Sequence, residues 1–198
     1  MAEVVLFHSA LGLRLGVKAA ADRLSAAGHT VYTPDYYDGD VFDNLDEGLS
    51  KRDEIGYSEI FRRARESVAG LPAELVFAGF SLGAMPAELL AASRPGALGA
   101  VLMHSAIPAE EFGVERWPAG VPVQVHYAAE DSWVEAEEVE GLAGEVRQAG
   151  AAFEEYTYPG SGHLFADPDF PGYDQESSDE MWRRVISFLD RIDAEGTR

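Results

Sequence analysis

The sequence predicts a protein of the α/β class, in which a mostly parallel central sheet of about six strands carries helices on both faces. Short apolar runs alternate with segments of helical periodicity from one end of the chain to the other, as a parallel sheet covered by helices requires. Most of these runs lack a polar residue at every second position, which is typical of strands buried on both faces. Because 198 residues with 46% apolar side chains suffice for one core, we expect a single domain over residues 1–198.

The predicted elements follow one another in a regular order. Strands are expected at residues 4–7, 30–33, 75–78, 100–103, 121–127 and 152–158, where β-branched, aromatic and other apolar residues gather. Helices are expected at residues 15–27, 57–69, 82–93, 134–149 and 176–192, where apolar residues recur at helical spacing. Gly28, Gly70 and Gly150 directly follow three of these helices, at the position where a glycine commonly ends a helix.

One segment, residues 34–56, shows no clear periodicity and is rich in Asp, Gly and aromatic residues. It follows the second expected strand and should leave from the carboxyl edge of the sheet, where ligands bind in open α/β folds. Loops of this length are often functional. We therefore interpret the segment as a candidate lid whose Tyr36, Tyr37 and Phe42 line or cover a site, or else as a solvated loop anchored by these aromatic residues.

Composition excludes several classes of partner and chemistry. The 35 acidic and 15 basic residues give a formal charge of −20, which repels nucleic acid and anionic membrane surfaces. The absence of cysteine excludes disulfides, thiolate catalysis and sulfur-based zinc sites. The chain shows no basic leader and no run of about 18 apolar residues, so we expect a cytoplasmic protein, a monomer or homodimer, that binds neither nucleic acid nor membrane.

The pentapeptide GFSLG at residues 79–83 matches the pattern G-x-S-x-G and lies between an expected strand and an expected helix. A chain that turns from strand to helix so sharply strains its central residue, Ser81, and glycines at both flanks avoid backbone collisions. The Ser81 hydroxyl then projects above the sheet at a helix N-terminus, whose positive end stabilises developing negative charge. Ser81 is thus the candidate nucleophile, with the Leu82 amide as an oxyanion donor; the alternative is an ordinary N-cap serine.

A serine nucleophile needs a base, and the base needs an acid that fixes its tautomer. Asp131 follows the expected strand 121–127, and His163 follows the expected strand 152–158, so both lie at the carboxyl edge of the sheet. The chain order of serine, acid and histidine is that of the α/β-hydrolase fold. The neighbouring Glu130 remains an alternative acid on spacing alone.

Four other histidines are weaker candidates for the base. His29 precedes an early strand and should lie at the opposite edge of the sheet, while His126 lies within a strand, where a hydrogen-bonded core role is expected. His8 and His104 end strands near the site without the right place in the chain order, and we interpret them as lining residues. Four aromatic residues near the strand ends could shape an acyl pocket, but aromatic residues at sheet edges are more often core, and we interpret them so; they are Trp117, Trp133, Phe165 and Tyr173.

With these residues placed, the chain resembles the dienelactone hydrolase family of α/β-hydrolases over nearly its whole length. The resemblance lies in four segments, at residues 8–13, 79–83, 126–134 and 162–165, and in separations of 50 residues from Ser81 to Asp131 and 32 from Asp131 to His163. It implies the three-layer α/β-hydrolase fold, Asp131 as the acid, and the backbone amide of Ala10 as the second oxyanion donor, with Gly12 keeping that loop tight. No metal and no organic cofactor are implied.

Three positions depart from the family pattern. Family members that open dienelactones have a cysteine at the position of Ser81, a glutamate at that of Ser9 and, at that of Asp167, an arginine that binds the substrate carboxylate. An aspartate at 167 would repel an anionic substrate, although Arg14 or Arg52 could replace the missing arginine. We therefore expect a serine hydrolase of small neutral esters or lactones, a dienelactone hydrolase-like carboxylesterase; the alternatives are a thioesterase or acyl-transfer hydrolase, and a ligand-binding protein without turnover.

Overall fold

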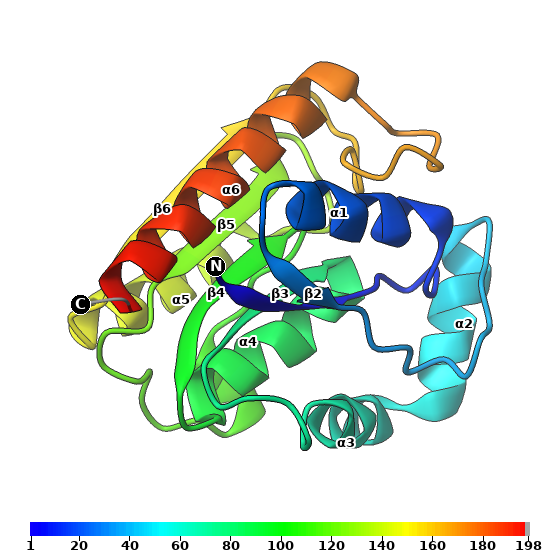
Figure 1. Cartoon of the computed structure of the whole chain (residues 1–198). Helices are drawn as coiled ribbons and strands as arrows, with labels where there is room; N and C mark the ends of the chain where they lie inside the picture. Colours follow the sequence, from blue (N-terminus) through cyan, green and yellow to red (C-terminus); the bar gives the residue numbers. More distant parts are fainter. Residues whose placement is uncertain (197–198) are drawn as a thin grey trace.

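A computed structural model of the chain describes residues 1–196, and these residues build one parallel sheet (Figure 1). Its strands are β1 (Glu3–Phe7), β2 (Thr30–Tyr32), β3 (Leu75–Phe80), β4 (Ala97–Met103), β5 (Val123–Ala128) and β6 (Phe153–Tyr158). The strand order is β2-β1-β3-β4-β5-β6, and every pair of neighbours is parallel. Each strand overlaps its predicted range.

The helices cover both faces of the sheet. They are α1 (Leu15–Ala26), α2 (Leu45–Ile55), α3 (Tyr57–Ser67), α4 (Ala84–Ser93), α5 (Ala136–Gln148) and α6 (Gln175–Gly196), with short 3-10 turns η1 (Ser81–Gly83) and η2 (Ala109–Phe112). No helix within residues 1–196 combines the length and the apolar character that crossing a membrane demands. The three-layer α/β architecture predicted from the sequence is confirmed.

Alternating strand residues divide the interior into two cores. In β1, Val4 and Leu6 pack with buried residues of α1 and α6, whereas Val5 and Phe7 pack with those of α3, α4 and α5. Figure 1 shows α1 and α6 on the near side of the sheet and α4 on the far side. Because successive strand residues point to opposite faces, a strand that is apolar throughout becomes the shared wall of both cores.

The prediction that residues 34–56 lack regular structure is wrong for the second half of the segment, which forms α2. Gly48 is the only buried residue of this helix, so its exposed face gives little apolar periodicity. A local signal was nevertheless present, because the Asn44 side chain accepts a hydrogen bond from the Glu47 amide at 3.0 Å and thereby caps the helix. Gly56, with φ of 80°, separates α2 from α3.

The parallel arrangement gathers the candidate functional residues at one edge. Since all six strands run in one direction, the loops that follow β1, β3, β5 and β6 leave from the same side of the sheet. These loops carry residues 8–13, Ser81, Asp131 and His163, which are far apart in the sequence. The topology alone therefore brings them together.

Glu88 is a buried carboxyl group on α4 without a cationic partner among the described residues. Its Oε2 atom accepts a hydrogen bond from the Ile107 amide at 3.3 Å, while Oε1 finds no partner within the described part of the chain. Burial raises the pKa of Glu88 well above the ordinary value of 4.5, and the nearby carboxylates of Glu145 and Glu138 add to this effect. A raised pKa in the folded state means that rising pH favours the unfolded state.

We therefore expect Glu88→Gln to stabilise the protein, more so at pH 8 than at pH 5. Below its unfolded-state pKa, protonated Glu88 makes its full contribution to the free energy of unfolding of wild type. Between the unfolded-state and the folded-state pKa, this contribution falls by about 1.4 kcal/mol per pH unit as the pH rises. Glutamine keeps the acceptor for Ile107 and removes the ionisation. Urea unfolding of both proteins at the two pH values measures the effect, and the exposed Glu137→Gln is the control. An equal difference at both pH values would contradict this account.

Candidate active site

Ser81 occupies a sharp turn between β3 and α4, and its backbone is strained. Its φ of 50° lies in the left-handed region that residues other than glycine rarely adopt. A Cβ atom on Gly79 would lie 2.0 Å from the Gly83 carbonyl oxygen, and one on Gly83 would lie 2.4 Å from the carbonyl oxygen of His8. Both glycines are therefore required by close backbone approach. Gly83 lets the turn at residues 79–83, called the elbow below, pack directly against the end of β1.

Three polar side chains form an unbroken hydrogen-bonded chain at this elbow. Ser81 Oγ lies 2.8 Å from His163 Nε2, and His163 Nδ1 lies 2.8 Å from Asp131 Oδ2. Ser81 is partly exposed, whereas the histidine and the aspartate are 8% and 6% exposed. An ionised carboxylate only accepts, so Nδ1 donates to Asp131 and Nε2 is free to accept the proton of Ser81.

The geometry brings Asp131, and not Glu130, to His163. The Glu130 side chain is exposed. Glu130 contacts the loop after β6 through its backbone, because its amide donates to the Gly160 carbonyl at 3.0 Å. The second oxygen of Asp131, Oδ1, accepts from the Trp133 amide at 3.0 Å. Both oxygens of this buried carboxylate thus have a donor, which holds the plane of the group.

The Trp133 side chain is part of the site, although the sequence interpretation assigned it to the core. It is 53% exposed, and its ring centroid lies 5.6 Å from that of His163. Trp133 follows the acid by two residues, so the amide that binds Asp131 and the indole beside His163 belong to one residue. The position of Trp133 two residues after Asp131 was the signal in the sequence that its side chain lies near His163.

The two expected oxyanion donors lie next to the elbow. Leu82 follows Ser81 in η1, and Ala10 lies in the loop after β1, against which Gly83 packs. In that loop Leu11 donates to Ser9 Oγ at 3.2 Å and Gly12 donates to the Ser9 carbonyl at 3.1 Å. The Ala10 amide donates none of the loop hydrogen bonds found within residues 1–196, so it remains available.

The segment at residues 34–56 supports the loop after β1 from behind. A Cβ atom on Gly48 of α2 would lie 2.2 Å from the Ala10 carbonyl oxygen, and one on Gly12 would lie 2.2 Å from that of Asp40. Tyr36 and Tyr37 are fully buried, at 1% and 0% exposure, so they pack in the core and do not cover the site as a lid would. The segment is a brace for the loop that holds Ala10.

The remaining histidines have the positions that the sequence indicates. His126 is buried in β5, where Nε2 donates to Gln124 Oε1 and Nδ1 accepts from Tyr158, both at 2.8 Å. Burial, with a smaller effect of the Arg184 charge, lowers the pKa of His126 to about 3, so it is a neutral core residue. His29 lies at the amino edge of β2, and burial lowers its pKa.

His104 is a buried residue directly behind His163. Its ring centroid lies 5.9 Å from that of His163 and 4.7 Å from that of Phe165, and it stacks with Phe80. Burial lowers the pKa of His104 well below its usual range, so its ring is neutral. It lines the inner side of the site, and its two buried ring nitrogens have no hydrogen-bond partner among the described residues.

Asp167 lines a small cavity together with Ser9, Phe80 and Leu164, next to the loop after β1 and the end of β3. Burial raises the pKa of this carboxyl group. Arg14 and Arg52, the alternatives for an anion-binding arginine, are both engaged: Arg14 donates to the Phe42 and Asp169 carbonyls at 3.2 and 3.0 Å, and Arg52 pairs with Asp53 at 2.7 Å. Within residues 1–196, no group of three or more acidic or histidine side chains is arranged to hold a metal ion.

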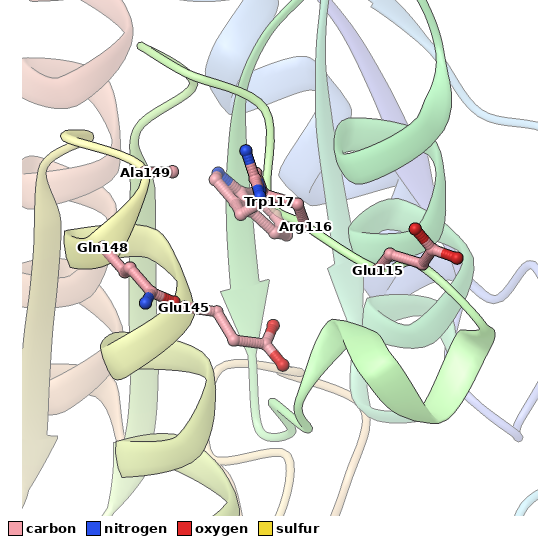
Figure 2. Close-up of a pocket in the computed structure, with 6 residues that line it drawn as sticks. All are labelled: Glu115, Arg116, Trp117, Glu145, Gln148 and Ala149. Atoms are coloured by element: carbon pink, nitrogen blue, oxygen red, sulfur yellow. The ribbon is translucent and has the colours of Figure 1, made fainter.

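A surface pocket near Trp117 shares no residue with this site (Figure 2). Glu145, Gln148 and Ala149 contribute from the C-terminal end of α5, which places the pocket at the amino edge of the sheet, opposite the elbow. The Glu145 carboxylate, which Figure 2 shows pointing away from α5, accepts from the amides of Ala109 and Glu110 at 2.8 and 3.3 Å. The Glu145 carboxylate thus caps η2, which gives this residue a structural role.

Comparison with known proteins identifies relatives over the whole fold. The sequence profile described as "Dienelactone hydrolase family" matches residues 1–193. A Yersinia pestis protein named "Putative carboxymethylenebutenolidase" is 25% identical over 94% of this chain and 76% of its own length. Among solved structures, a dienelactone hydrolase-like promiscuous phosphotriesterase from metagenomic libraries superposes with a TM-score of 0.78 at 22% identity, covering 97% of this chain and 87% of that one.

A second solved structure supports the same fold. Esterase 2 of Thermogutta terrifontis, in a form phosphorylated by paraoxon, superposes with a TM-score of 0.69 at 16% identity over 96% of this chain and 82% of that one. Both structures share the α/β-hydrolase fold with this protein, which confirms the predicted fold class. Since the profile covers almost every residue, the chain belongs to the dienelactone hydrolase family and is a carboxylic ester hydrolase.

Proposed function

We propose that the protein is a serine hydrolase that cleaves small neutral esters or lactones through a covalent acyl-enzyme, with Ser81, His163 and Asp131 as its catalytic triad. The observation that carries the proposal is the unbroken chain of two 2.8 Å hydrogen bonds from Ser81 to His163 and from His163 to Asp131 at a strained elbow. This is the arrangement that activates a serine hydroxyl. A cytoplasmic location and a small-molecule substrate are part of the proposal.

In the first half of the reaction, Ser81 Oγ attacks the ester carbonyl while His163 Nε2 takes the hydroxyl proton. The carbonyl oxygen becomes an oxyanion, which the amides of Leu82 and Ala10 stabilise. Asp131 stays ionised, holds Nδ1–H in place and stabilises the imidazolium. When the tetrahedral intermediate collapses, the bond to the alkoxide breaks and His163 gives this leaving group the proton.

In the second half, His163 acts as a base again, now towards water. The water oxygen attacks the acyl carbonyl, its proton moves to Nε2, and the same two amides stabilise the second oxyanion. Collapse returns the proton to Ser81 Oγ and releases the carboxylic acid. For a lactone, acid and alcohol are parts of one molecule. The alcohol end therefore stays covalently attached to the acyl group on Ser81 until this step.

A neutral substrate is supported by the charges near the site. Asp167 lies below the elbow, and Arg14 and Arg52 are engaged with other groups, so the described residues offer no free arginine there for a substrate carboxylate. The formal charge of −20 also repels anions at long range. We expect activity on neutral short-chain esters to exceed that on a dienelactone, which carries a carboxylate.

A fluorophosphonate probe tests the proposal directly. The probe phosphonylates only a serine that a base has activated, so we expect wild type to be labelled on the tryptic peptide that contains Ser81, and His163→Ala to be labelled at least about 100-fold more slowly. Mass spectrometry of the peptide and p-nitrophenyl acetate hydrolysis are the measurements. An unlabelled protein that hydrolyses none of a panel of esters, thioesters and lactones would be a ligand-binding protein. A clear preference for thioesters would replace the ester assignment.

We expect Gly48→Ala to lower kcat for the best ester about 10-fold or more. Its new Cβ atom would lie 2.2 Å from the Ala10 carbonyl oxygen, so α2 or the loop must move, and misplacement by about 1 Å is enough for large losses in rate. Steady-state kinetics and thermal unfolding are compared with Gly144→Ala, another helical glycine, whose Cβ would meet nothing within 4 Å. If both variants keep the wild-type kcat, α2 does not brace the oxyanion loop.

A further inference from the structure

We propose that His8 is a positioning residue that aims the Ala10 amide at the oxyanion, an inference that rests on the function proposed above. His8 follows β1 directly and is fully buried, with 0% exposure. It is not part of the Ser81–His163–Asp131 chain. Its role follows from its hydrogen bond to the peptide group whose N–H belongs to Ala10.

The first step concerns the His8 tautomer. His8 Nδ1 lies 2.7 Å from the Ser9 carbonyl oxygen. A carbonyl oxygen only accepts, so Nδ1 must carry the proton. His8 Nε2 lies 3.3 Å from the Tyr36 amide, which donates to it, and this fixes the opposite nitrogen as the acceptor. The hydrogen bonds therefore place a proton on Nδ1 and engage both ring nitrogens.

The second step concerns the peptide between Ser9 and Ala10. Its carbonyl oxygen is held by two donors, His8 Nδ1–H at 2.7 Å and the Gly12 amide at 3.1 Å. The described residues contain no cis peptide, and in a planar trans peptide the N–H points opposite to the C=O. Two donors on the Ser9 oxygen thus fix the direction of the Ala10 N–H, which is left without a partner in the loop.

The third step concerns what holds the His8 ring. The ring stacks on Tyr36, with centroids 3.7 Å apart and planes inclined by 24°, and the edge of Tyr37 lies against it at 5.0 Å. The Tyr36 hydroxyl donates to the His8 carbonyl oxygen. Asp35 Oδ1, 3.4 Å from Nε2, accepts its hydrogen bond from the Tyr37 amide at 2.8 Å. The segment after β2 therefore fixes His8, and His8 fixes the oxyanion peptide.

Two substitutions of His8 separate its nitrogens. Asparagine places an amide N–H near the position of Nδ1 and keeps the donor to Ser9, whereas glutamine reaches the position of Nε2 and loses that donor. With p-nitrophenyl acetate as substrate, we expect His8→Asn to stay within about 3-fold of wild type in kcat, and His8→Gln and His8→Leu to lose about 10- to 100-fold with little change in KM. Thermal unfolding shows which variants keep the fold.

A trifluoromethyl ketone gives a readout that a merely structural role would not move. The Ser81 oxygen adds to its ketone carbon and forms a tetrahedral alkoxide that resembles the oxyanion intermediate. The affinity of the inhibitor therefore reports how well the oxyanion donors stabilise this charge. We expect its inhibition constant to rise in His8→Gln by the same factor by which kcat/KM falls, and to stay near wild type in His8→Asn. A folded His8→Gln with wild-type kcat and wild-type inhibition would overturn the inference.

The wild-type protein provides a second test that needs no variant to fold. In ¹⁵N-histidine-labelled protein, the His8 ring, assigned by its proximity to Tyr36, should show a protonated Nδ1 and a bare Nε2 at neutral pH; the opposite tautomer would overturn the inference. Failure of the proposed function looks different, because wild type would then hydrolyse no ester and Ser81 would not react with the fluorophosphonate. If wild type is active and depends on Ser81, but substitution of His8 changes neither kcat nor inhibition, only the positioning role of His8 is refuted.

Discussion

Ser81→Ala is expected to lower kcat for p-nitrophenyl acetate by about 10⁴- to 10⁶-fold, because removal of the serine nucleophile costs about 10⁶-fold in another serine hydrolase and an activated ester retains some background reaction. The substitution removes the oxygen that lies 2.8 Å from His163 Nε2 and leaves no other hydroxyl in the hydrogen-bonded chain. The elbow glycines keep their place, and alanine can adopt the φ of 50° at a small cost in stability. Purified wild type and variant are compared in steady-state ester hydrolysis.

The control for this loss is Ser93→Ala at the end of α4, whose hydroxyl donates to the backbone carbonyl of Leu89. It should keep the wild-type kcat, and it shares expression and purification with Ser81→Ala, so any contaminating esterase would appear equally in both. If Ser81→Ala hydrolyses the ester at the wild-type rate, the nucleophile lies elsewhere and the proposed mechanism fails.

The parts of this molecule that the sequence predicted are those with local signals. Apolar runs and helical spacing predicted the six strands and five of the six α-helices, because buried strands and amphipathic helices must show these patterns. The GFSLG turn placed Ser81 at the carboxyl edge, and the chain order placed Asp131 and His163 there too. Parallel topology then leaves little freedom, since the ends of neighbouring strands meet at one edge.

The parts that the sequence did not predict depend on contacts between distant segments. The α2 helix buries Gly48 and packs Leu45, Leu49 and Ile55 against the cores only partly buried, so its apolar periodicity is weak and the close backbone approach at Gly48 leaves no pattern in the sequence. Whether His8 lines a site or orients a peptide depends on Tyr36, 28 residues away in sequence. The Trp133 indole lies beside His163 because its own amide binds Asp131, a geometry that composition does not reveal.

Asp131→Asn is expected to lower kcat by about 10³- to 10⁴-fold while KM changes little. The reason lies in the second hydrogen bond of this group. Asp131 Oδ1 accepts from the Trp133 amide, so an asparagine must place its carbonyl oxygen there and turn its NH₂ group towards His163 Nδ1. That NH₂ group only donates, so Nδ1 must accept and the imidazole proton moves to Nε2.

In that tautomer Nε2 donates to Ser81 Oγ, 2.8 Å away, and can no longer accept its proton. The three side chains would then superpose on those of wild type while the base is lost. The exposed Glu130→Gln is the matched control, which should stay within about 2-fold of wild type because Glu130 contacts the neighbouring loop only through its backbone. Stopped-flow measurement of the p-nitrophenol burst isolates acylation, where the loss should appear in full. A large loss in Glu130→Gln with a small one in Asp131→Asn would assign the acid to Glu130, and equal retention in both would mean that His163 works without a carboxylate partner.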